Sequence, residues 1–169
     1  HLLHTPLANA PDQEIVYRDV SRYTYRGLRE RISRLASGLT SLGVRPGNTV
    51  AVLDWDTHRY LEAFFAVPML GAVLHTVNVR LSSDQLLYTL NHAQDDVILV
   101  NAEFVPLLES ISDRLETVKQ FVLLTDGGSP AAGSIQFAAE YEQLLASGDA
   151  DFPFHDFDEN TRATTFYTT

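Results

Sequence analysis

The sequence of 169 residues contains no cysteine, which excludes disulfide bonds, thiolate metal ligands and a cysteine nucleophile. It also lacks an apolar run of about 18 residues, the length that a membrane-spanning helix needs. The longest apolar stretch, at 63–74, contains Pro68 and Gly71 and is typical of a buried segment. The first residues have no secretion-signal pattern. We therefore expect no transmembrane segment, and the lack of cysteine fits a reducing cytoplasm.

Basic residues are scarce. The sequence has 12 Lys and Arg against 22 Asp and Glu, for a net charge of −10. This charge argues against a nucleic acid or an anionic membrane as the main partner. The excess of acid is confined to residues 95–159, where Arg114 and Lys119 are the only basic residues. A solvated acidic face is the favoured interpretation, and an acidic docking site is the alternative.

Several catalytic motifs are also absent. The sequence has no G-x-G-x-x-G, no G-x-x-x-x-G-K-S/T and no G-x-S-x-G, so neither a dinucleotide fingerprint, a Walker loop nor a serine elbow lies within it. The six histidines are dispersed, and no two have the spacing of a metal site. For His75, inside an expected strand, a hydrogen-bonded core histidine is favoured over a residue that lines a ligand cleft. Lys119, the only lysine, receives no catalytic role.

Alternating apolar patterns predict the fold class. Four hydrophobic runs, at 49–53, 73–77, 97–100 and 121–124, begin about 24 residues apart. Helical patterns fill the gaps at 58–67, from a capping box at Ser82 and Gln85 through Leu90, and at 103–115. This spacing is that of repeated βα units. We therefore expect an α/β fold with a mostly parallel sheet flanked by helices.

The two ends of the chain add further elements. Residues 15–18 and 23–25 predict a small hairpin, and Thr24 is positioned to cap a helix that Gly43 ends. After a loop at 125–136, we expect a short helix at 137–145 and an irregular acidic stretch at 147–161. Residues 163–167 have strand propensity and return to the core.

Polar residues follow two of the expected strands, at the sheet edge where open α/β folds bind ligands. Asp54 and Asp56 could hold a divalent metal there, but capping of the next helix by Asp56 or Thr57 is favoured. Asn78 and Arg80 could meet an anionic ligand, and a role in the loop and its ion pairs is favoured over this.

The last two residues are the strongest clue to function. Thr168 and Thr169 follow directly after the last expected strand. Hydroxyl residues in this place are suited to a loop of small residues that cradles phosphates through its N–H and O–H groups. A well-built domain rarely ends in this way, so we expect the chain to be a fragment.

An ordered set of short motifs resembles the adenylate-forming, or acyl-CoA synthetase, superfamily. The motifs are YTY at 23–25, RLA at 34–36, LGV at 42–44, PGNTVAV at 46–52, FAVP at 65–68, GAV at 71–73, NVRL at 78–81 and ATTFYTT at 163–169. Three further motifs resemble bacterial medium-chain fatty-acyl-CoA ligases, including those that act on 3-methylmercaptopropionate. They are LDWD at 53–56, HRYLE at 58–62 and LHTVN at 74–78. Gly27 departs from the family, which often has Glu there.

The resemblance implies a carboxylate–CoA ligase reaction in two steps. ATP and a small carboxylic acid give an acyl adenylate, and the thiol of coenzyme A then displaces AMP, with Mg²⁺ neutralising the phosphates. Residues 1–169 would be the N-terminal portion of the adenylation domain, ending at the start of its phosphate-binding loop and lacking the C-terminal domain. Thr168 and Thr169 would be the first residues of that loop. The resemblance also implies a homodimer, and no catalytic residue or metal ligand within this sequence.

Two other interpretations remain. A free-standing α/β module could bind a nucleotide or a partner without catalysis, although such a module should not stop on an unfinished loop. The natural product could also be a truncated, non-catalytic interaction protein. If the chain is instead the N-terminal portion of a ligase, we expect the fragment to be inactive alone. Its parent would be an acid–thiol ligase with a medium-chain or short fatty-acid-type substrate.

Overall fold

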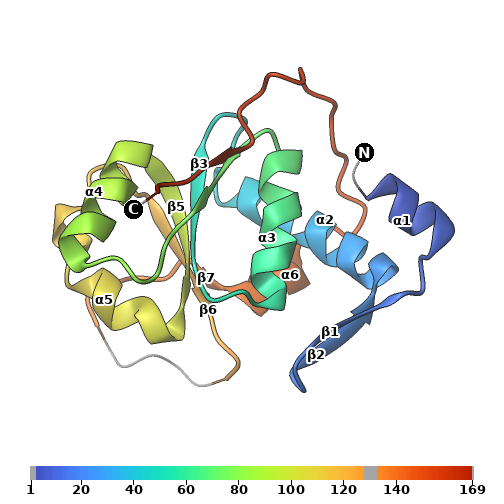
Figure 1. Ribbon diagram of the computed structural model, residues 1–169, viewed down its shortest axis with the longest axis horizontal. Coiled ribbons are helices and arrows are strands. Elements are labelled where there is room, and N and C mark those ends of the chain that lie inside the picture. The colour runs from blue at the N-terminus through green and yellow to red at the C-terminus, as the bar shows by residue number, and fades with distance from the viewer. Residues whose placement is uncertain (1–2, 128–132, 169) are drawn as a thin grey trace.

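The computed structural model describes residues 3–127 and 133–168 and contains a six-stranded sheet in the order β7-β6-β5-β3-β4-β8 (Figure 1). All five strand pairs are parallel. The strands are β3 (Thr49–Leu53), β4 (Val73–Thr76), β5 (Asp95–Asn101), β6 (Gln120–Leu124), β7 (Ala139–Glu140) and β8 (Thr164–Thr165). The expected α/β class is confirmed.

Helices cover both faces of the sheet. Helices α2 (Tyr25–Ser41), α3 (His58–Met69) and α6 (Tyr141–Ser147) lie on one face, and α4 (Ser83–Ala93) and α5 (Val105–Glu109) lie on the other (Figure 1). Side chains of a strand alternate between faces. Val50 and Val52 therefore pack in the core that α2, α3 and α6 cover, while Ala51 and Leu53 pack in the core that α4 and α5 cover. This double burial explains why β3 is buried throughout and apolar from Val50 to Leu53.

The N-terminal hairpin and the helix after it agree with their predictions, whereas α1 was not predicted. After α1 (His4–Asn9), β1 (Glu14–Tyr17) and β2 (Ser21–Thr24) form an antiparallel hairpin. Oγ1 of Thr24 accepts a hydrogen bond from N of Gly27 at 3.3 Å and caps α2, so the missing Glu at position 27 does not prevent the helix from starting. Gly43 follows the helix with φ of 95°, a conformation that favours glycine.

The expected helix at 103–115 is wrong in its extent. The segment forms a 3₁₀ turn η1 (Ala102–Phe104), the short helix α5 and a second turn η2 (Ser112–Arg114). Pro106 is suited to the first turn of α5 because a proline has no N–H to leave unpaired. The hydroxyls of Ser110 and Ser112 then donate to the carbonyls of Leu107 and Glu109, which competes with continuation of the helix.

Two other predicted elements are shorter than expected. The helix predicted at 137–145 begins at Tyr141, because Ala139 and Glu140 pair with β6 as strand β7 and Glu140 caps the helix. The strand predicted at 163–167 is limited to Thr164 and Thr165, which pair with β4. Beyond them the chain is held by side-chain contacts of Tyr167 rather than by strand pairing.

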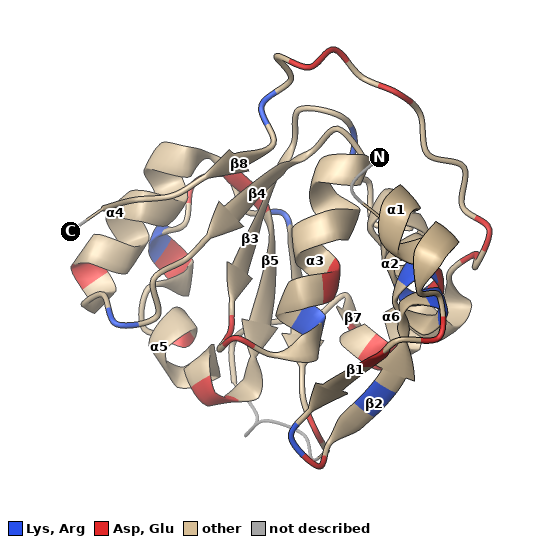
Figure 2. Cartoon of the chain, turned by 45° about the vertical axis from the view of Figure 1, so that its right-hand side comes forward, with Lys and Arg blue, Asp and Glu red and all other residues tan. Residues whose placement is uncertain are grey.

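The acidic stretch between α6 and β8 runs over the surface. In Figure 2 its acidic residues follow the long segment that loops away from the sheet. Asp149, Asp151, Asp156, Asp158 and Glu159 are all exposed. Their exposure agrees with a solvated acidic face over this stretch, whereas Asp95, at the start of the acidic half, is buried. Within the described residues, no helix combines the length and apolarity needed to cross a bilayer.

Candidate functional site

The order of the strands places a switch point between β3 and β5. The chain leaves β3 toward β4 on one side and leaves β5 toward β6 on the other, so their carboxyl ends flank the position where such sheets bind ligands. Here Nδ2 of Asn101 donates to Oδ1 of Asp54 at 2.7 Å. Above them Nε1 of Trp55 donates to Glu103 at 2.5 Å, and its ring lies 5.1 Å from that of Phe104. Side chains from both strand ends therefore contact one another at this position.

Asp54 and Thr57 form a helix cap rather than a metal site. Oγ1 of Thr57 accepts a hydrogen bond from N of Tyr60 at 3.3 Å and donates its own proton to Oδ2 of Asp54. Burial raises the pKa of Asp54, and the hydrogen bonds from Thr57 and Asn101 oppose that rise. Asp56 is exposed on the other side of the turn. The hydrogen bond from N of Tyr60 supports the capping interpretation, with Thr57 as the cap.

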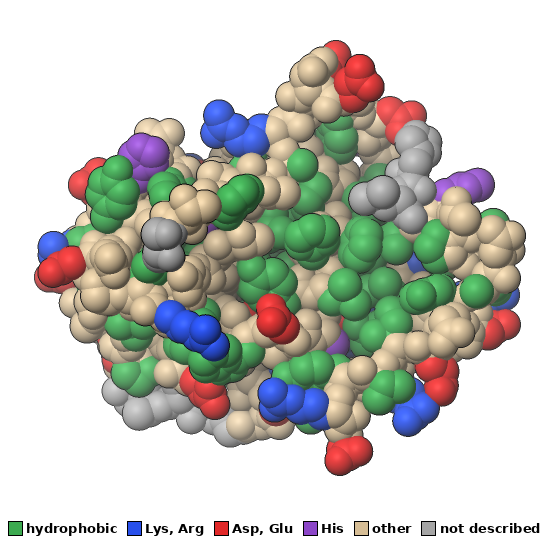
Figure 3. Space-filling view, in the orientation of Figure 1, with side chains coloured by type: hydrophobic (Ala, Val, Ile, Leu, Met, Phe, Trp, Pro, Cys, Tyr) green, Lys and Arg blue, Asp and Glu red, His purple; other side chains and the backbone are tan. Residues whose placement is uncertain are grey.

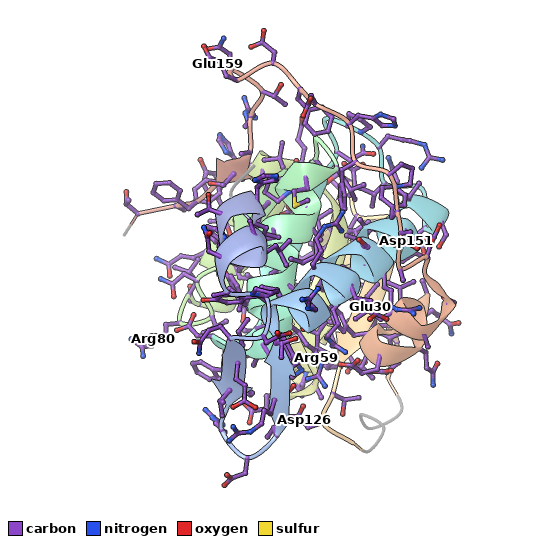
Figure 4. All side chains as sticks on the ribbon, turned by 90° about the vertical axis from the view of Figure 1, so that its right-hand side faces the viewer. Glu30, Arg59, Arg80, Asp126, Asp151 and Glu159 are labelled. Carbon is purple, nitrogen blue, oxygen red and sulfur yellow. The ribbon has the colours of Figure 1, made fainter. Side chains whose placement is uncertain are left out.

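Asn78 and Arg80 shape a loop. Oδ1 of Asn78 accepts a hydrogen bond from N of Arg80 at 3.0 Å, and N of Leu81 donates to the carbonyl of Asn78 at 3.2 Å. Arg80 is exposed and extends away from the helices in Figure 4. The hydrogen bonds of Asn78 agree with the predicted role in the loop.

The start of the predicted phosphate loop lies beside β4 and α4. Thr168 is exposed and directly follows Tyr167, while Thr169 lies outside the described residues. The hydroxyl of Tyr167 is 2.7 Å from Nδ1 of His92, on α4. Its ring lies 5.3 Å from that of His75, on β4. The residue before the two threonines is therefore fixed to both a strand and a helix.

His75 is a core histidine, as predicted. Its Nδ1 lies 2.7 Å from Oδ2 of Asp95, and both side chains are almost fully buried. Burial raises the pKa of Asp95, and the interaction with His75 opposes that rise. Oδ1 of Asp95 has no hydrogen-bond partner among the described residues. The pair supports the packing of Tyr167 from below.

A buried ionic network beside the sheet was not predicted from the sequence. Its centre is Glu62 on α3, whose side chain has no exposed surface. Oε1 of Glu62 accepts hydrogen bonds from Nε of Arg31 at 2.7 Å and from the hydroxyl of Tyr23 at 3.0 Å, and Oε2 accepts one from Tyr141 at 2.7 Å. We call these residues, with Glu142 and Arg59, the Glu62 network.

The second carboxylate of this network is Glu142. Its Oε1 accepts hydrogen bonds from Arg31 and from Arg59, both at 3.0 Å, and lies 3.9 Å from Nε2 of His58. Arg59 also contacts Asp126 at 2.7 Å (Figure 4). Burial acts to raise the pKa of Glu142, but the interactions with His58 and Arg31 outweigh it and hold that pKa well below its usual range.

The network joins elements rather than presenting reactive groups. Arg31 comes from α2, Glu62 from α3 and Tyr141 from α6, so three helices on one face of the sheet are tied together. Burial first, and then the charge of Glu62, raises the pKa of Tyr141 well above its ordinary value. The signal in the sequence was an acidic residue at position 62 on the apolar side of a helix, which needs a buried partner.

An apolar groove lies on the outer surface of α3. It has a volume of about 450 Å³ and is lined mainly by Leu3, Leu7, Phe64, Phe65, Pro68 and Met69, and Ala163 and Thr164 border it. Figure 3 shows hydrophobic side chains gathered over this part of the surface. Phe64 is 46% exposed and also lines a second cavity of about 460 Å³ beside the hairpin. We call the first cavity the α3 groove.

Comparisons with known proteins agree with this geometry. The model of the AMP-binding enzyme family matches residues 3–169. The 3-methylmercaptopropionyl-CoA ligase of Ruegeria pomeroyi is 40% identical over 149 residues, covering 88% of this chain and 28% of that protein. The medium-chain-fatty-acid–CoA ligase of Ectopseudomonas oleovorans is 35% identical over 150 residues, covering 89% of this chain and 28% of that protein.

Solved structures give the same fold. The anthranilate CoA ligase AuaEII, in complex with anthranoyl-AMP, superposes with a TM-score of 0.85 at 21% identity, covering 96% of this chain and 30% of that chain. A fatty acyl CoA synthetase of Mycobacterium tuberculosis superposes with a TM-score of 0.85 at 22% identity, covering 99% and 32%.

An open parallel sheet with helices on both faces defines an α/β protein. The chain belongs to the AMP-binding enzyme family, whose model matches it from residue 3 to residue 169. It spans about 28% of the length of the two curated ligases described above.

Proposed function

We propose that this chain is the N-terminal part of an ATP-dependent carboxylate–CoA ligase that releases AMP. The observation that carries the proposal is the family match over residues 3–169, together with curated relatives that are CoA ligases. The substrate would be a small carboxylic acid of medium-chain or short fatty-acid type. The names of the two relatives at 35–40% identity support this class.

In this proposal the reaction has two steps. A carboxylate oxygen attacks the α-phosphorus of ATP, an acyl adenylate forms and pyrophosphate leaves. The thiol of coenzyme A then attacks the acyl carbon, its proton is lost, the thioester forms and AMP leaves. Thr168 and Thr169 would donate hydrogen bonds to the phosphates as the first residues of the loop. Mg²⁺ bound to ATP would neutralise the charge of its phosphates.

We propose further that residues 1–169 are one portion of a larger adenylation domain, and that the rest of that domain covers the α3 groove. Two facts support this: the groove is apolar and open, and the chain spans 28% of its curated relatives. The groove is bordered by Ala163 and Thr164, close to where β8 meets the sheet.

Assembly and location belong to the same proposal. A homodimer formed through this N-terminal region follows from the family resemblance, and light scattering of the full-length protein would test it. A cytoplasmic location is supported by the absence of cysteine from the 169 residues.

The direct test is an assay of AMP formation by the full-length protein, with ATP, coenzyme A and a series of carboxylic acids from two to twelve carbons. AMP that appears only when all three substrates are present supports the proposal. Residues 1–169 alone should give none. If neither protein forms AMP with any acid while the full-length protein is folded, the chain is better described by the alternative, a non-catalytic α/β module that binds a nucleotide or a partner.

A further inference from the structure

The side chain of Tyr167 contacts two different elements of the fold. Its hydroxyl lies 2.7 Å from Nδ1 of His92, on α4, and its ring lies 5.3 Å from that of His75, on β4. The rings of His92 and Tyr167 are 5.7 Å apart in an edge-to-face arrangement. We call Tyr167 and these neighbours, with Tyr88 and Asp95, the Tyr167 cluster.

The base of this cluster is rigid. The imidazole of His75 is 1% exposed and lies 2.7 Å from a carboxylate oxygen of Asp95, which is itself buried. His92 is supported from another side by Tyr88, whose ring stacks on it at 5.4 Å with an angle of 23°. Tyr167 therefore contacts a buried pair on one side and an exposed, stacked pair of rings on the other.

The Tyr167 cluster lies directly before the residues of the predicted phosphate loop. Strand pairing ends at Thr165, so backbone hydrogen bonds with β4 do not reach Tyr167. Phe166 is 66% exposed and gives the segment little support. The contacts of Tyr167 are then the last ones that fix the chain before Thr168, and Figure 1 shows this end of the chain lying across α4.

On the basis of the proposed function, we propose that Tyr167 is a positioning residue for the phosphate loop, acting through its hydrogen bond with His92. It does not touch ATP in this account. It sets where the loop begins. The hydroxyl and N–H groups of Thr168 and the following residues are then ordered before ATP binds, which lowers the entropic cost of binding the phosphates. Loss of the tyrosine hydroxyl should weaken the use of ATP and leave the other two substrates unaffected.

The test uses the full-length enzyme that carries this sequence and its Tyr167→Phe variant, which keeps the ring on His75 and removes only the hydroxyl. A net hydrogen bond is worth about 0.5–1.5 kcal/mol, so kcat/KM for ATP should fall about 2- to 12-fold. KM for the carboxylate and for coenzyme A should stay the same, and so should the melting temperature. His92→Ala should show the same fall, and His92→Asn, which keeps an acceptor, should recover part of it.

Two further variants separate a positioning role of Tyr167 from a merely structural one. Tyr25→Phe, on α2 and outside the Tyr167 cluster, is the matched control and should behave as the unmodified enzyme. The double variant Tyr167→Phe/His92→Ala should be no worse than either single variant if the two residues act through one bond. An unchanged kcat/KM for ATP in Tyr167→Phe, or an equal loss for all three substrates with a lower melting temperature, would overturn the inference. An unmodified enzyme that forms no AMP would instead refute the proposed function.

Discussion

Arg31 on α2 places its Nε 2.7 Å from Oε1 of Glu62 on α3, a carboxylate with no exposed surface. The same guanidinium donates through a second nitrogen to Glu142 on α6 at 3.0 Å. One side chain thus connects three helices that pack on the same face of the sheet. A buried carboxylate is costly to leave without partners, so the packing of this face depends on the network staying complete.

Removal of the central carboxylate should be strongly destabilising. Glu62→Ala leaves Arg31, Tyr23 and Tyr141 without their shared acceptor, and loss of one partner of a buried ion pair costs about 3–5 kcal/mol. The measurement is the free energy of unfolding from denaturant titration of the chain. Glu30→Ala is the control, because Glu30 pairs with Arg34 on the exposed side of α2 and such pairs contribute about 0–1 kcal/mol. Equal costs for the two variants would contradict the account.

The pKa of Glu142 predicts a dependence of stability on pH. This pKa is lower in the folded state, because the interactions with His58 and Arg31 outweigh burial, so folding favours the charged form. The resulting stabilisation is present above the ordinary glutamate pKa of about 4.3 and is lost as the pH falls through the lower, folded value. The difference in unfolding free energy between the unmodified chain and Glu142→Gln should therefore be largest near pH 7.

The same titration provides its own control. Glu116 is exposed and lies outside the network, so Glu116→Gln gives the baseline for loss of one surface carboxylate. The gap for Glu142→Gln should shrink below about pH 4, where the unfolded chain becomes protonated. A gap that stays constant from pH 7 to pH 3 would show that the charge of Glu142 does not contribute to stability.

The cap at the start of α3 predicts a contrast between neighbouring residues. Thr57→Ala removes the acceptor for N of Tyr60 and should cost about 1 kcal/mol, within the range of other helix caps. Asp56→Ala, at an exposed position, should change stability by less than about 0.5 kcal/mol.

Mg²⁺ should raise the melting temperature of the unmodified chain no more than that of Asp54→Asn. A selective rise in the unmodified chain would revive the metal-site hypothesis.

The α3 groove predicts a difference between the chain and the full-length protein. Phe64→Lys places a charge at a position that is 46% exposed here, so it should be tolerated in residues 1–169. If the rest of the domain covers the groove, the same charge is buried in the full-length protein and should destabilise it severely. Val20→Lys, at the turn of the hairpin, is the matched exposed control. Thermal unfolding of all four proteins checks this, and equal tolerance in both lengths would count against a covered groove.

The sequence predicts the sheet better than the irregular parts. Strands such as Thr49–Leu53 are fully buried, mostly apolar and regularly spaced, so pattern alone finds them. The break after Glu109 was missed because it depends on serine hydroxyls that bond to nearby carbonyls, a choice that hydrophobic periodicity does not record.

The candidate site divides in the same way. The core role of His75 was predicted from local position, and the cap was predicted at Asp56 or Thr57, of which Thr57 forms it. The Glu62 network was missed because its members are far apart in the sequence: Arg31 and Glu142 meet only after three helices have packed on one face. Nor does a pattern reveal that Tyr167 reaches His92, since this contact depends on the short length of β8.

The measurement that tests the central claim most directly is exchange of labelled pyrophosphate into ATP, catalysed by the full-length protein in the absence of coenzyme A. An enzyme that forms an acyl adenylate reversibly incorporates the label only when its carboxylate is present. The account predicts exchange that requires a fatty-acid-type carboxylate and needs no coenzyme A. Exchange without any carboxylate, or acyl-CoA formation with no exchange under any condition, would contradict it.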